Sequence, residues 1–355
     1  MDALFEIRGK SSLNQLKFPK MKVEILKEDA AETKISRVFG DYDFGKKLRL
    51  KVGTHLGENT SKVTGKWVTQ VTTKKYHRLE SENEPYREVY PYKALEILGI
   101  EPPRAVRAEI SYEDTGWTRN STHQDSPKIK RKAFLYEHRK GMSKRLGWEF
   151  LAKEGDTIPE SQIDVLFADQ ADSYHEKLDV LVATRVMLAN TLFGNWDYRV
   201  PIRVHRNDSE DRLHNIYIFR DENGAWIPVP FDYDLSSIVT GFNSARGRFG
   251  WRARSKVKRI MKSNIREIRT ELNKVSRHQR GNMTPDKFFQ KAMAPFLTKK
   301  DSLFNLSTKL GIDKKGIEFI KEHLDAFYEV TSSVAQEPLR RQRSRQRRNG
   351  SRNSR

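Results

Sequence analysis

The feature that most constrains this chain is a change in the prevailing hydrophobic periodicity near residue 139. Before it, short segments alternate between apolar and polar residues, as in "FPKMKVEIL" at 18–26, a pattern typical of half-buried strands. After it, apolar residues recur at helical spacing, and the longest run is "SYHEKLDVLVATRVMLANTLF" at 173–193. Strands grouped before helices, rather than alternating with them, predict an α+β fold. We therefore expect a strand-rich part at 1–138 and a helix-rich part at 139–335.

Local patterns predict the elements within these two parts. In the first part, a helix at 86–99 stops at Gly99, and strands are expected at 4–8, 18–26, 46–53, 66–72, 105–112 and 132–138. In the second part, "NIYIFRD" and "WIPVPFD" read as two strands of a hairpin joined through "ENG". Amphipathic helices are expected through most of 255–334.

The net charge of +20 is concentrated in part at the C-terminus. Residues 339–355 hold eight arginines and no acid, and the rest of the chain keeps +12 once these eight are subtracted. We expect 336–355 to be a disordered basic tail, because its composition is low in apolar residues. Such a surface favours phosphate-bearing ligands, nucleic acid or anionic membranes, although a basic body also serves solubility alone.

Other features of the composition exclude some classes. The chain has no apolar run of about eighteen residues, so we expect no membrane span. The absence of cysteine excludes disulfides and thiolate metal sites and fits an exported protein and a cytoplasmic one alike. The N-terminus carries no signal-peptide pattern and reads as the start of a strand, which fits a chain with a further segment upstream.

Four polar side chains occupy suggestive positions in the second part. Asp197 follows the long apolar helix, Asn215 opens the hairpin, and Asp232 and Asp234 follow its second strand. A hairpin brings its outer ends together, so Asn215 and Asp232 should be neighbours, with the Asp197 loop leading into them. Carboxylate and amide oxygens suit Mg²⁺ that also binds phosphate oxygens and water. This order matches a phosphoryl-transfer site, with one acid acting on the acceptor hydroxyl and the others holding metal. The alternatives are a turn cap at Asp197, an Asx turn, and a helix N-terminus at "DYDLSS".

The segments "LFGNWDYR", "HNIYIFRDENGAWIPVPFDYDLSSIV" and "IRGKSSLNQLKFPKMKVEI" together resemble the motifs of CotH-type atypical kinases. "YREVYPYKALEILGI" is similar to that family's glutamate-bearing helix, and "KAFLYEHRKGMSKRLG" to its strand and hinge. The similarity runs in order from residue 7 to about 240. It implies a two-lobed protein-kinase-like fold, with a nucleotide-binding N-lobe at 1–138 and a catalytic C-lobe at 139–335. It also implies ATP and Mg²⁺ as cofactors and a protein serine or threonine as acceptor.

The resemblance also implies residue roles. Lys22 would reach the α- and β-phosphates, with Lys20 a near alternative on the same strand face, and Glu88 would hold that lysine. Asp197 would be the catalytic acid. The turn over the phosphates would consist of Arg8, Gly9, Ser11 and Ser12. The hinge beside the adenine would be Phe134 to Glu137. The metal ligands would be Asn215, Asp232 and Asp234.

Some features depart from the kinase pattern and leave a catalytically degenerate kinase-fold scaffold, or a nucleic-acid-binding protein, as the alternative. Eighteen positions separate Asp197 from Asn215, where protein kinases use about five. Proline favours the first turn of a helix, so a helix that began at Pro91 would leave Glu88 outside it. The tail contains three serines among its arginines: Ser344, Ser351 and Ser354. The tail could be a phosphate acceptor within the chain, or a plain electrostatic segment that binds nucleic acid.

Overall fold

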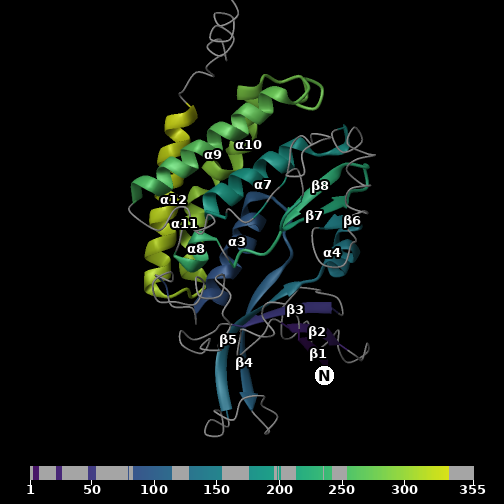
Figure 1. The fold of residues 1–355 in the computed structure, drawn as a ribbon, viewed down its shortest axis with the longest axis vertical. Helices are drawn as coiled ribbons and strands as arrows, with labels where there is room; N and C mark the ends of the chain where they lie inside the picture. The colour runs from purple at the N-terminus through teal and green to yellow at the C-terminus, as the bar shows by residue number, and fades with distance from the viewer. Residues whose placement is uncertain are drawn as a thin grey trace, which may run out of the picture.

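The computed structural model describes residues 3–7, 21–25, 47–52, 79, 83–113, 128–153, 176–195, 198, 200, 213–234, 236–241 and 254–335. Within these ranges helices and sheets segregate along the chain much as the periodicity predicts, and the fold is α+β. Figure 1 shows a five-stranded sheet at one end, a group of long helices at the other, and a three-stranded sheet beside those helices.

The five-stranded sheet is antiparallel throughout and follows the order β1-β2-β3-β5-β4. Its strands correspond closely to the predicted ones, and the strand predicted at 66–72 lies outside the described residues. In the backbone register, Lys22 is paired with Glu6 of β1 and with Arg49 of β3. The strands are β1 Ala3–Ile7, β2 Met21–Ile25, β3 Lys47–Val52, β4 Ala105–Glu113 and β5 Lys128–Glu137.

Helix α3, Glu84–Leu98, connects the sheet to the helices. It ends at Gly99, as predicted, because Gly99 adopts the left-handed conformation that terminates helices. A helix that starts at Pro91 is excluded: Pro85 lies in the first turn, Pro91 lies inside the helix, and Glu88 is helical and buried.

One charged side chain of α3 is completely enclosed. Arg87 is 0% exposed; its Nε donates to the carbonyl oxygen of Val239 at 2.6 Å and its Nη1 to Asp313 Oδ1 at 3.1 Å. The Tyr90 hydroxyl adds a hydrogen bond of 2.9 Å to the carbonyl of Leu303. These bonds fasten α3 to three distant parts of the helical region.

The predicted hairpin is confirmed as strands β7, Ile216–Arg220, and β8, Trp226–Pro230. A third strand, which was not predicted, pairs with β7: β6, Glu149–Lys153, follows helix α4, Arg139–Leu146. The hairpin buries both faces, because Ile216 and Ile218 contribute to the main core while Tyr217 and Phe219 pack in a second cluster with Met142 of α4. Successive side chains of β7 therefore alternate between two apolar clusters, and not between core and solvent.

The long apolar run folds as helix α7, Val180–Phe193, and is not one helix from residue 173 as predicted: Glu176 and Lys177 are helical, but Leu178 and Asp179 interrupt the helix. The helix begins later because the Asp179 side chain caps the N–H of Val182 at 2.9 Å, and Leu178 instead forms a bridge to Trp226. The predicted end is confirmed at Phe193. The helices that follow are α8 Ser237–Thr240, α9 Arg254–Lys274, α10 Pro285–Thr298, α11 Lys300–Lys309 and α12 Lys314–Ala335.

One continuous core joins these parts. It takes in apolar side chains of α3, of β4 and β5, and of helices α7 and α9–α12. No described helix is both long and apolar enough to span a membrane.

Candidate functional site

The open end of the β7–β8 hairpin brings Asn215 and Asp232 together, as predicted. The N–H of Phe231 donates to the carbonyl of Asn215 at 3.0 Å, directly beyond the last register pair, Ile216 with Pro230. Both residues adopt a left-handed backbone, with φ of 52° at Asn215 and 61° at Asp232. Such a conformation costs an ordinary L residue about 1–2 kcal/mol, and Asn and Asp tolerate it best.

Helix α3 holds the loop that follows β8. The hydroxyl of Tyr92 accepts the N–H of Asp232 at 3.2 Å, and Glu88 Oε1 accepts the N–H of Tyr233 at 3.3 Å. The Tyr233 ring is fully buried and lies edge-on to Tyr92, with ring centroids 5.2 Å apart. The backbone at Asp232 is thus fixed by two side chains from one helix.

The same loop is also fastened to the turn that precedes Asp197. Both the N–H and the hydroxyl of Ser237 donate to the carbonyl of Gly194, at 3.0 Å and 3.2 Å. A Cβ at Gly194 would lie 2.5 Å from Ser237 Oγ and 2.9 Å from His323 Nε2. Only glycine fits this turn, and the segment leading to Asp197 is therefore packed against the segment following Asp232.

Buried polar groups surround this turn. Asn195 is 1% exposed, and its Nδ2 donates to Asn190 Oδ1 at 2.8 Å while its N–H donates to the Asn190 carbonyl at 2.9 Å. Asn190 Nδ2 in turn donates to the carbonyl of Val186 at 2.9 Å. Helix α7 therefore positions the start of the loop through side chains as well as through its backbone.

His323 of α12 also lies close to this turn. It is 3% exposed, stacks on Phe319 with centroids 6.1 Å apart, and its Nε2 has no hydrogen-bond partner in the described part of the chain. Burial lowers the pKa of His323 to about 3, so the imidazole is neutral at physiological pH. Burial likewise raises the pKa of Tyr233 well above its usual value, so the phenol stays protonated.

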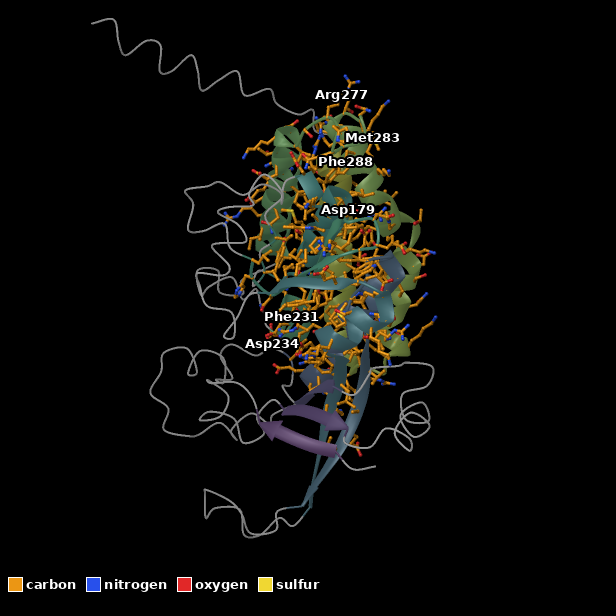
Figure 2. The ribbon with its side chains drawn as sticks, turned by 90° about the vertical axis from the view of Figure 1, so that its right-hand side faces the viewer. Asp179, Phe231, Asp234, Arg277, Met283 and Phe288 are labelled. Carbon is orange, nitrogen blue, oxygen red and sulfur yellow. The ribbon has the colours of Figure 1, made fainter. Side chains whose placement is uncertain are left out.

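Figure 2 places Phe231 and Asp234 at the end of the helical part that faces the five-stranded sheet. Asp234 is half-buried, three residues before the buried Ser237. The described part of the chain thus contains Asn215, Asp232 and Asp234 of the predicted metal site near the junction of the two parts.

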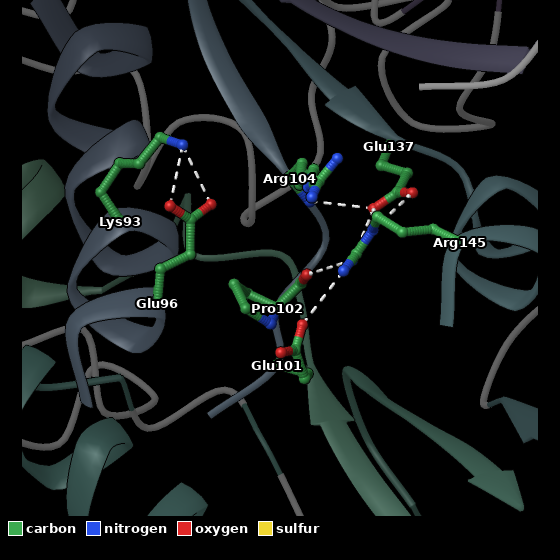
Figure 3. A network of polar contacts seen from close by, with 7 residues as sticks. All are labelled: Lys93, Glu96, Glu101, Pro102, Arg104, Glu137 and Arg145. Atoms are coloured by element: carbon green, nitrogen blue, oxygen red, sulfur yellow. Dashed lines mark hydrogen bonds and ion pairs between the residues drawn. The ribbon is translucent and has the colours of Figure 1, made fainter. Parts of the chain in front are cut away.

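The predicted hinge residue Glu137 lies at the end of β5, and its carboxylate binds within the protein. Arg145 of α4 makes a two-pronged ion pair with it, at 3.1 Å from Nε to Oε1 and 2.9 Å from Nη2 to Oε2. The N–H of Arg104 donates to Oε2 at 3.2 Å, and the Glu137 N–H donates back to the Arg104 carbonyl at 2.8 Å. Arg145 also reaches Glu101 and the Pro102 carbonyl, as Figure 3 shows. This network joins β5, α4 and the segment before β4.

The remaining predicted residues fall into two groups. Lys22 lies within β2, and its proposed ion pair with Glu88 stays a prediction. The others lie outside the described residues: Arg8, Gly9, Ser11, Ser12, Lys20 and Asp197.

Four residues around the site were not predicted from the sequence: Gly194, Ser237, His323 and Arg87. The first carried a usable signal, since a glycine directly after an apolar helix predicts a left-handed cap. His323 falls on the buried side of α12 between Ile320 and Leu324, so helical periodicity could have placed it in the core. Nothing local marks Arg87 or Ser237, because their partners lie far away in sequence.

Comparison with protein-family models and with curated proteins gives no match for this chain. Among the described residues, no group of three or more His, Cys, Asp and Glu side chains is arranged to hold a metal ion. Asn215, Asp232 and Asp234 carry amide and carboxylate oxygens, and Mg²⁺ in nucleotide complexes takes one or two carboxylates and completes its shell with phosphate and water.

Proposed function

We propose that the chain is an atypical kinase with two lobes, which transfers the γ-phosphoryl group of ATP to a hydroxyl acceptor. The observation that carries this proposal is the paired left-handed backbone at Asn215 and Asp232. Of the three non-glycine residues with positive φ in the described ranges, two are these neighbours; the third is Asn282. Strained backbone persists where the surrounding structure enforces it and often marks functional sites.

The arrangement around this pair supports the proposal. Asp232 would supply the main charge toward Mg²⁺, with Asn215 and Asp234 as further oxygen ligands. Held by these residues, Mg²⁺ would supply positive charge that offsets the negative charge of the transferring group. Asp197 would orient or deprotonate the acceptor hydroxyl, and its loop starts from the Gly194 turn that Ser237 holds.

The position of α3 also supports it. The resemblance assigns Glu88 to a lysine on the sheet, and the helix that carries Glu88 already contacts the loop containing Asp232. A nucleotide between the sheet and this loop would be contacted from both parts. Because the Glu137 N–H and carboxylate are engaged with Arg104 and Arg145, a hinge contact to the adenine would use the Glu137 carbonyl.

The acceptor class rests on the resemblance alone and is proposed as a protein serine or threonine in a basic context. The tail serines Ser344, Ser351 and Ser354 are candidates within the chain itself. The second candidate function, a degenerate kinase fold acting as a nucleic-acid-binding scaffold, is favoured by the net charge of +20.

The proposal is tested by measuring the affinity of the chain for ATP with Mg²⁺ by calorimetry. Asp232→Asn keeps the shape of the side chain and removes its charge, so we expect affinity for ATP with Mg²⁺ to fall at least about tenfold, or about 1.4 kcal/mol. Asp325→Asn makes the same change on the exposed side of α12 and should leave affinity unchanged. Equal affinity of the wild type and a folded Asp232→Asn variant would reject the metal-site assignment.

A further inference from the structure

The backbone N–H of Asp232 is held by a neutral hydroxyl group from α3. This N–H donates to the Tyr92 hydroxyl at 3.2 Å, and the N–H of the next residue, Tyr233, donates to Glu88 Oε1 at 3.3 Å. Of these two bonds, only the first is made by the backbone of Asp232 itself. The Tyr92 hydroxyl is therefore the contact from α3 that acts most directly on the backbone from which the Asp232 carboxylate extends.

Packed rings restrict the Tyr92 side chain, so its hydroxyl is a fixed acceptor. Tyr92 is 0% exposed. Tyr136 stacks on its ring and Phe134 is tilted against it, each with ring centroids 6.0 Å apart, while Tyr233 lies edge-on at 5.2 Å. Phe134 and Tyr136 belong to β5, so this strand orients a side chain that α3 supplies. A group that is already ordered by packing holds its partner without a further loss of conformational entropy.

The backbone at Asp232 needs such a restraint, because its φ of 61° is unfavourable for an L residue. A strained conformation of this kind persists only where the surrounding structure enforces it. The angle φ describes rotation about the N–Cα bond, so a fixed direction of the N–H limits the values that φ can take. The bond to Tyr92 therefore acts on the same angle that is strained.

We propose that Tyr92 is a positioning residue for Asp232: its hydroxyl keeps the Asp232 backbone in the left-handed conformation from which the carboxylate binds a metal–nucleotide complex. This role rests on the proposed function, because it requires that Asp232 binds metal in that complex. Tyr92 itself contacts neither the metal nor the nucleotide and acts through Asp232 alone. A tyrosine that served only the core would contribute to stability and leave the binding of ligand unchanged.

The same helix supplies a matched control. Tyr90 is also 0% exposed, and its hydroxyl donates to the carbonyl of Leu303 in α11 at 2.9 Å. Tyr92→Phe and Tyr90→Phe each remove one oxygen atom and keep the aromatic ring. The two variants differ in whether the lost hydrogen bond reaches Asp232.

The test measures the affinity of the full chain for ATP by calorimetry, once with Mg²⁺ and once in excess EDTA. We expect Tyr92→Phe to weaken binding of ATP with Mg²⁺ about fivefold, the equivalent of one hydrogen bond. In EDTA its affinity for ATP should change by less than about twofold, because Asp232 acts through the metal. Tyr90→Phe should change both affinities by less than about twofold. Equal losses in the two variants, or an equal loss of affinity with and without Mg²⁺, would overturn the role of Tyr92.

A double-mutant cycle separates positioning of Asp232 from a general loosening of the fold. In an Asp232→Asn background the carboxylate charge is absent, so adding Tyr92→Phe should weaken binding of ATP with Mg²⁺ by less than about twofold. If the two losses are instead additive, Tyr92 acts by a route other than Asp232 and the proposal is rejected. Urea denaturation shows whether each variant is folded under the conditions of the binding measurement.

Failure of this role and failure of the proposed function give different results. If the wild type does not bind ATP with Mg²⁺, or if folded Asp232→Asn binds it as tightly as the wild type, the metal site is rejected and the role of Tyr92 with it. If Asp232→Asn weakens binding while Tyr92→Phe does not, only the role of Tyr92 is rejected.

Discussion

Helices α3 and α7 end in the same way, but in different surroundings. Gly99 has φ of 68° and Gly194 has φ of 60°, and in each case the next residue donates back to the last helical turn. A Cβ at Gly99 would meet no atom within 4 Å, whereas a Cβ at Gly194 would overlap Ser237 and approach His323. The two caps have the same local geometry. Gly99 only ends α3, whereas Gly194 ends α7 at the point where three elements of the candidate site meet.

The largest expected effect of this difference is on the free energy of unfolding when each of the two glycines is replaced by alanine. Gly99→Ala carries the left-handed backbone cost alone, about 1 kcal/mol. Gly194→Ala adds a steric overlap in a buried site, so we expect a total loss of about 3 kcal/mol or more in the free energy of unfolding. Urea denaturation of both variants measures the contrast. Similar losses would show that the packing around Gly194 gives way easily.

A smaller effect concerns pH, because the α7 end is packed against a neutral imidazole. The pKa of His323 is about 3 in the folded chain and about 6.5 when unfolded, so below pH 6.5 the unfolded state takes up a proton that the folded state refuses. Stability should therefore fall as pH falls, by about 2 kcal/mol between pH 6.5 and 5 from this group.

The variant His323→Phe should lose this part of the pH dependence, measured as the difference in unfolding free energy between the two pH values. The exposed His278 supplies a control, since His278→Phe should keep the wild-type difference. If His323→Phe retains the wild-type difference, His323 is protonated in the folded state or is not buried in solution.

The smallest effect expected is from the hydroxyl that joins the two segments. Ser237→Ala removes the bond from Oγ to the Gly194 carbonyl but keeps the bond from the backbone N–H, so we expect a loss of about 1 kcal/mol in stability. Ser302→Ala, on the exposed side of α11, should change stability by less than about 0.5 kcal/mol. If the proposed function is right, Ser237→Ala should also lower the rate of phosphoryl transfer more than Ser302→Ala does. Unchanged stability in Ser237→Ala would show that the backbone bond alone holds the turn.

The parts of the fold that follow from local pattern were predicted well. The hairpin was evident from two apolar strands around "ENG", and its geometry alone made Asn215 and Asp232 neighbours. The ends of α3 and α7 followed from Gly99 and from the last apolar turn before Gly194. These features depend on interactions between residues close in sequence.

The missed features depend on distant partners. Strand β6 is short and follows a helix, and its pairing with β7 joins residues about seventy positions apart. The predicted start of α7 was wrong because a bridge from Leu178 to Trp226 competes with extension of the helix toward the N-terminus. Periodicity describes one segment at a time, so it cannot show which groups from other segments will meet it.

The buried guanidinium of Arg87 has a consequence for how the molecule opens. By position in the sequence, α3 belongs with the strands, yet releasing it would leave the Val239 carbonyl and the Asp313 carboxylate without their partner and would expose its own core face. Local opening of α3 would therefore cost nearly as much as opening the helices it contacts. The boundary between cooperative unfolding units should thus lie on the sheet side of α3, and not at the change in periodicity near residue 139.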